Sequence, residues 1–142
     1  MNPFIDPKKR SILLPGGCKD LAELLRLPVR GTGDPVAVFI RETLLQAEGV
    51  GASEVLIGAP MIHEGECTIT QRINGHLHHV STVSADFRLA ILAALLRMAD
   101  SAQANFPSQG VATLKLKRRQ LKWRIQIESP DADCILTPVE EG

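Results

Sequence analysis

Residues 67–83 read CTITQRINGHLHHVSTV, and this stretch decides the fold. Two sets of residues alternate from Cys67 to Ile73. The mainly apolar set is Cys67, Ile69, Gln71 and Ile73, and the polar set between them is Thr68, Thr70 and Arg72. This period of two is typical of a strand with one buried face. Asn74-Gly75 follows, the pair that best signals a two-residue hairpin turn, and residues 76–83 form the return strand. The sequence therefore predicts an antiparallel hairpin.

Downstream of this hairpin the pattern changes to a helix and then back to strands. Apolar residues at helical spacing predict a helix from Asp86 to about Ala102, and its buried stripe comprises Phe87, Ala90, Ile91, Ala94, Leu95 and Met98. Residues 107–110 read as a turn, and residues 111–117 and 121–127 read as a second hairpin. Residues 134–136 are expected to add an edge strand.

Upstream, proline and glycine divide the chain. Residues 1–17 read as an extended arm, residues 18–27 as a short amphipathic helix and residues 28–35 as a linker. Asp34 and Pro35 suit the start of a second helix that ends near Glu48. Its expected buried face contains Val38, Leu44, Leu45 and Ala47, and a short strand follows at residues 54–57.

These elements predict the α+β class, with an antiparallel sheet of about four to six strands and helices packed on one face. We expect an N-terminal arm, short helix and linker in residues 1–34, a folded module in residues 35–130, and an edge strand or tail in residues 131–142. No apolar run approaches the roughly 18 residues that a membrane span needs. The three cysteines form no CxxC pair, which fits free thiols in a reducing, cytoplasmic compartment.

Four short motifs, in order over about residues 36–128, resemble the domain that precedes the motor in type II secretion and type IV pilus assembly ATPases. Residues 48–57 (EGVGASEVLI) are similar to the segment that reads A-S-D-I-H-I-E-P in that family. Residues 71–77 (QRINGHL) resemble its R-x-R-I-D-G-x-L hairpin. Residues 96–100 (LRMAD) and 107–110 (PSQG) resemble its R-I-K-x-M-A helix and P-Q-D-G turn. The resemblance implies a PAS-like sheet on the rim of a hexameric ring.

The family's nucleotide-facing positions are only partly kept. The resemblance implies that Arg72 and Arg97 could contact a phosphate or a partner, because a guanidinium holds phosphate bidentately. Thr70 stands where the family has the first arginine of its pair, and Leu56 and Gly58 replace its histidine and glutamate. The sequence contains no GxxxxGK[ST] phosphate loop, so we expect no ATP hydrolysis of the family's kind and no cofactor.

Basic residues concentrate in the second predicted hairpin. We expect four of them to share one sheet face and Arg118 and Arg119 to lie at the hairpin tip; the set is Lys115, Lys117, Arg118, Arg119, Lys122 and Arg124. A solvated face is the first interpretation, a docking surface for an acidic protein the second, and nucleic acid the least favoured, because Trp123 points to the other side.

The histidines at positions 76, 78 and 79 are interpreted as exposed strand residues rather than metal ligands. Two imidazoles could share one face, but zinc needs further ligands, for which only His63, Glu64 and Glu66 are candidates. GxSxG, HExxH and paired-carboxylate motifs are absent from the sequence, so no enzyme is predicted.

The leading hypothesis is a non-catalytic regulatory or assembly module. It would bind protein partners of a secretion, pilus or competence machine, or a second copy of itself, without inserting into a membrane. A PAS-like sensor of a small ligand and a nucleic-acid-binding module built on residues 115–124 are the alternatives.

Overall fold

The computed structural model describes residues 34–59, 65–99, 107–129 and 131–139. The elements in chain order are α2 (Pro35–Gly49), β1 (Glu54–Ile57), β2 (Glu66–Ile73), β3 (His76–Ser84), α3 (Ala85–Met98), β4 (Ser108–Lys115), β5 (Gln120–Ile127) and β6 (Cys134–Pro138). The arm, the first helix and most of the linker predicted in residues 1–34 lie outside the described residues, as do His63 and Glu64.

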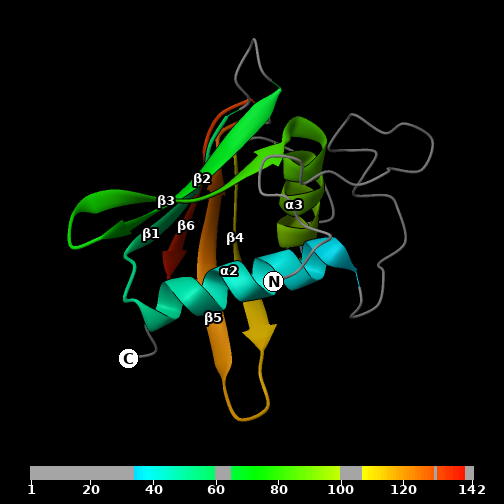
Figure 1. The fold of residues 1–142 in the computed structure, drawn as a ribbon. Coiled ribbons are helices and arrows are strands. Elements are labelled where there is room, and N and C mark those ends of the chain that lie inside the picture. Colours follow the sequence, from blue (N-terminus) through cyan, green and yellow to red (C-terminus); the bar gives the residue numbers. More distant parts are fainter. Residues whose placement is uncertain (1–33, 60–64, 100–106, 130, 140–142) are drawn as a thin grey trace.

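The described strands form one open antiparallel sheet in the order β3-β2-β1-β6-β5-β4, which confirms the α+β class and the predicted number of strands (Figure 1). The expected position of the last strand was wrong. β6 pairs with β1 on one side and with β5 on the other, so it is central rather than an edge strand. The folded module therefore extends at least to Pro138, and not only to residue 130.

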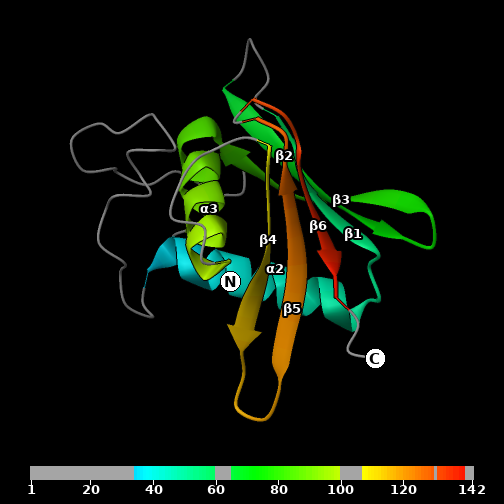
Figure 2. The same ribbon diagram turned by 180° about the vertical axis from the view of Figure 1, so that it is seen from behind.

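Both helices pack on the same side of the sheet. α2 crosses in front of the strands in Figure 1 and behind them in Figure 2. We call the helix-covered side the inner face and the opposite side the outer face. Side chains alternate between the two faces along each strand. The buried hydrophobic residues of the inner face are Val55, Ile57, Cys67, Ile69, Val83, Ala112, Trp123, Ile125, Ile127, Cys134 and Leu136.

Local signals fix where the helices begin. The Asp34 carboxylate accepts a hydrogen bond from the Val36 amide at 2.9 Å, and Pro35 occupies the first turn of α2, as the sequence predicts. The Ser84 hydroxyl accepts a hydrogen bond from the Phe87 amide at 3.1 Å and caps α3.

The buried faces of the helices are broader than the sequence pattern suggests. In α2, Leu44 and Ala47 are buried as expected, but Val38 is 39% exposed, and Phe39 and Ile40 face the core in its place. α3 is buried on most of its surface, because it packs against both the sheet and α2. It buries Arg88, Leu92, Ala93 and Leu96 in addition to most of the predicted stripe.

The hairpin predicted in residues 67–83 is confirmed, and it consists of β2 and β3. Asn74 and Gly75 both have positive φ angles, 52° and 83°, as a two-residue hairpin turn of the type I′ class requires. The pairing then shifts by one residue: Ile69 lies opposite Ser81, whereas Thr70 lies opposite His79. Val80 is therefore an extra residue in β3, a bulge that exchanges the two faces along the rest of the strand.

Candidate interaction surface

Arg72 and Arg97, the residues that the family resemblance implicated in phosphate or partner contact, do not converge in this structure. Arg72 lies on the outer face, where its Nε donates to Glu54 Oε1 at 3.0 Å across the β1–β2 pair and its Nη1 donates to the Gly75 carbonyl at 3.2 Å. Arg97 lies in the last turn of α3, on the inner side of the sheet. The two guanidinium groups therefore cannot hold one ligand.

The Arg97 guanidinium is partly buried. Burial lowers the pKa of Arg97, and the nearby Asp34 carboxylate partly opposes this shift. Nη2 of Arg97 is buried and has no hydrogen-bond partner among the residues that the structure describes. The negative charge of the nearby Asp34 makes the position less suited to a phosphate.

The basic residues of the second hairpin are only partly arranged as predicted. Lys115, Lys122 and Arg124 lie on the outer face, because they alternate with the buried Ala112 and Trp123 along β4 and β5. Lys117 does not join them: β4 ends at Lys115, and residues 116–119 form the turn. The expected face of four cations is thus a face of three, with three further exposed cations, Lys117, Arg118 and Arg119, in the turn.

Arg119 lies in the turn at the hairpin tip, as predicted, but its side chain turns back to α2. Its Nη1 and Nη2 donate to the two carboxylate oxygens of Glu48 at 2.7 and 2.9 Å. These hydrogen bonds raise the pKa of the Arg119 guanidinium. A bidentate pair fixes orientation as well as distance. It therefore ties the far end of the β4–β5 hairpin to the last turn of α2.

The histidines of β3 are exposed, as the sequence analysis expected. His76 and His78 lie on the inner-face side and His79 on the outer face, where its Nε2 is 3.0 Å from Thr82 Oγ1. Within the described parts of the chain, no group of three or more His, Cys, Asp or Glu side chains is placed to hold a metal ion.

A fully buried arginine, Arg88, is the charged residue that the sequence analysis missed. It is 0% exposed; its Nε donates to the Gly58 carbonyl at 2.7 Å, and its Nη2 donates to the Ala132 carbonyl. Asp133 lies nearby and accepts a hydrogen bond from the Ala59 amide at 2.7 Å. Arg88 thus connects the N-terminal end of α3 to the ends of β1 and β5. Burial lowers its pKa, against the opposing effect of the neighbouring Cys67, Cys134 and acidic residues.

The sequence contains one unusual feature at Arg88, but this feature does not predict that the arginine is buried. It sits between Phe87 and Leu89 in the first turns of an otherwise apolar helix. An arginine in such a run is usually placed on the solvent side, since charged residues are rarely buried without partners. Its partners are backbone carbonyls from distant loops, which no local pattern reveals.

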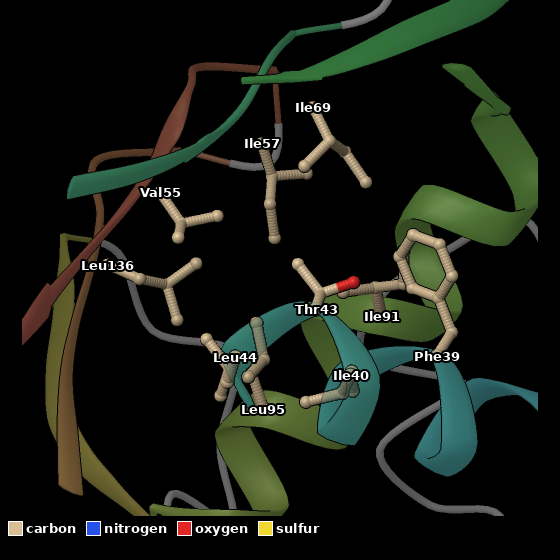
Figure 3. A pocket seen from close by; sticks show the side chains of 10 residues that line it. All are labelled: Phe39, Ile40, Thr43, Leu44, Val55, Ile57, Ile69, Ile91, Leu95 and Leu136. Atoms are coloured by element: carbon tan, nitrogen blue, oxygen red, sulfur yellow. The ribbon is translucent and has the colours of Figure 1, made fainter. Parts of the chain in front are cut away.

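A small apolar space lies between α2, α3 and the inner face. Figure 3 shows side chains from all three directions converging on it, including Ile40 and Leu44 of α2, Ile91 of α3 and Ile57 and Leu136 of the sheet. The space amounts to about 20 Å³, enough for about one water molecule. Small-molecule sites usually enclose roughly 300–1,000 Å³. The described core therefore offers no ready-made cavity for the small ligand that the sensor alternative requires.

Among the described helices, none is long and apolar enough to cross a membrane. No family model matches the chain, and no curated protein matches its sequence.

Proposed function

We propose that this chain is a non-catalytic assembly or regulatory module that makes protein–protein contacts, in a machine like those of the secretion and pilus ATPases that its motifs resemble. The observation that carries the proposal is the outer face of the sheet. It is not covered by either helix. It exposes Leu77 (52%) beside Arg72 at the β3 edge of the sheet and Val111 (37%) beside Arg124 at the β4 edge. Arginine is among the residues that are enriched in protein interfaces.

The outer face also has the stiffness that an interface needs. Its strands belong to a six-stranded sheet with a packed inner face, and one of its cations, Arg72, is held in place by an ion pair with Glu54. A rigid surface loses little entropy when a partner docks.

Site-specific crosslinking in the native host tests this proposal. A photo-reactive amino acid would replace Leu77 or Val111 on the outer face, and Val38 of α2 would serve as the control. Val38 has a similar exposure of 39% but lies on the helical side. We expect crosslinks from the two outer-face positions to components of a secretion or pilus-type machine. Crosslinks only to unrelated proteins, or equal yields from Val38, would contradict the proposal.

A further inference from the structure

The two edges of the sheet differ, and only one is suited to accept another strand. β3 carries the bulge at Val80, and a bulge disturbs the regular row of peptide groups that strand addition needs. β4 pairs with β5 without a register shift over its eight residues, from Ser108 to Lys115, and no other strand of the described chain lies beside it. β4 therefore has a regular, open edge.

The hydrogen bonds near the hairpin turn show which peptide groups of β4 point to that edge. The Leu116 amide donates to the Arg119 carbonyl at 2.8 Å, so these two residues form a hydrogen-bonded pair. Hydrogen-bonded and non-hydrogen-bonded pairs alternate along an antiparallel ladder. Val111, Thr113 and Lys115 are therefore in non-hydrogen-bonded pairs, and their peptide groups point away from β5. The other side of β5 leads to the same orientation. The Val139 amide donates to the carbonyl of Lys122, the residue opposite Thr113, so this carbonyl points away from β4.

The same three residues place their side chains on the outer face, beside the cations of β5. Val111 lies opposite Arg124, and Lys115 ends the strand next to the exposed Lys117 and Arg118 of the turn. Six of the 16 basic residues of the chain lie between Ser101 and Ile127, where there is no acidic residue. The rest of the chain therefore has ten basic residues against 16 acidic ones. The edge of β4 thus combines a local positive charge with peptide groups that are not paired to any strand of the described residues.

We infer that the edge of β4 binds an extended acidic segment of a partner protein, which adds to the sheet as a further strand. Main-chain hydrogen bonds to Val111, Thr113 and Lys115 would supply affinity, and a carboxylate of the added segment would lie opposite Lys115. This inference rests on the proposed role in protein contacts and names the partner's chemistry. Nucleic acid fits the edge less well, because it cannot extend a sheet and because Trp123, the chain's only tryptophan, is 1% exposed and lies on the inner face.

The ion pair of Arg119 with Glu48 supports this site. It holds the turn against α2, so the edge strand keeps its direction without a further strand beside it. The partner segment then meets a preformed edge, which lowers the entropy cost of binding.

The test uses the whole chain and a labelled peptide about as long as β4 that alternates glutamate and threonine. Fluorescence anisotropy would measure its binding at low and high salt, next to a matched lysine–threonine peptide and a single-stranded oligonucleotide. We expect the acidic peptide alone to bind well and to weaken as salt rises. Equal binding of the oligonucleotide would overturn the inference, because it would show a merely electrostatic surface.

Two variants test separately what the main-chain hydrogen bonds and the side-chain charge contribute to binding. Thr113→Pro removes an amide that points to the open edge and leaves the β4–β5 ladder intact, so binding should be lost. Lys115→Glu should weaken binding by about tenfold, since it turns a favourable cross-strand charge pair into a repulsive one. Arg41→Glu, on an exposed position of α2, makes the same change of charge on the other side and should leave binding unchanged. Binding that survives Thr113→Pro in a folded protein would overturn the inference.

Amide exchange measured by NMR gives a second readout that does not depend on the proline variant. The bound peptide should protect the amides of Val111, Thr113 and Lys115 and leave those of Ala112 and Leu114, already paired with β5, nearly unchanged. Protection without this alternation would contradict strand addition. A chain that dimerises through this edge would identify a second copy as the occupant and would also overturn the inference. Peptide binding does not depend on the native machine, so the crosslinking result can fail independently.

Discussion

Arg88 provides the sharpest test of what holds the fold together. Its side chain is fully buried and donates to at least two carbonyls, those of Gly58 and Ala132, on loops at the ends of different strands. Replacing Arg88 with methionine keeps much of the volume but removes every donor. Each buried carbonyl left without a partner costs about 1–3 kcal/mol. The two carbonyls together would then cost about 2–6 kcal/mol.

We therefore expect Arg88→Met to lower the free energy of unfolding by about 2–6 kcal/mol, a large part of the roughly 5–15 kcal/mol typical of a domain. Lysine keeps the charge but presents a single compact ammonium group that cannot reach both carbonyls as a planar guanidinium does. Arg88→Lys should thus fall between wild type and Arg88→Met.

Urea unfolding followed by the fluorescence of the buried Trp123 would measure these differences. Arg41→Met, at an exposed position of α2, is the matched control and should change stability by no more than about 0.5 kcal/mol. Replacing buried charges with apolar side chains is sometimes neutral, but here the carbonyls of Gly58 and Ala132 would lose the donors that Arg88 supplies. An Arg88→Met protein within about 1 kcal/mol of wild type would refute the reasoning, because it would mean that water or other groups satisfy those carbonyls.

Three further predictions concern a turn, a thiol and an ion pair. Gly75→Ala should lower the free energy of unfolding in urea by about 1–2 kcal/mol, because φ is +83° there, although a Cβ would meet nothing within 4 Å. Gly49→Ala, at the end of α2, is the control and should leave the free energy of unfolding unchanged. Burial raises the pKa of Cys134 from 9.0 to about 12, so its contribution to stability is complete below pH 9 and is lost as pH rises towards 12. Cys134→Ala should remove this decrease in the free energy of unfolding between pH 9 and pH 12. An unchanged decrease would exclude this thiol as its source. Glu48→Gln should leave the unfolding midpoint nearly unchanged but speed amide exchange around Arg119, and unchanged exchange would show that the pair does not restrain the turn.

The sequence predicted those elements whose signals are local. The Asn74-Gly75 turn, the Asp34 cap and the alternation in β2 each depend on a few adjacent residues, and the structure has all three. Strand order is different, because it depends on contacts between distant segments. Residues 134–136 read as an edge strand, and nothing in their composition shows that β6 lies between β1 and β5.

The candidate site was predicted only in part, for the same reason. Alternation along the strands put Lys115, Lys122 and Arg124 on one face, and the structure agrees. The direction of the Arg119 side chain could not be predicted, because its partner Glu48 is 71 residues away and belongs to a different element. Arg88 was missed because carbonyls from two distant loops make its burial tolerable.

The difference between the two edges has a consequence for stoichiometry. A sheet with two regular edges can grow in both directions, and such growth is how exposed edges lead to aggregation. Here β3 is interrupted at Val80, whereas β4 is regular. Strand addition to the chain itself is therefore expected at β4 and not at the other edge of the sheet. The proposed strand addition thus leads to a complex of one partner segment per chain, and titration of the acidic peptide should saturate at that ratio.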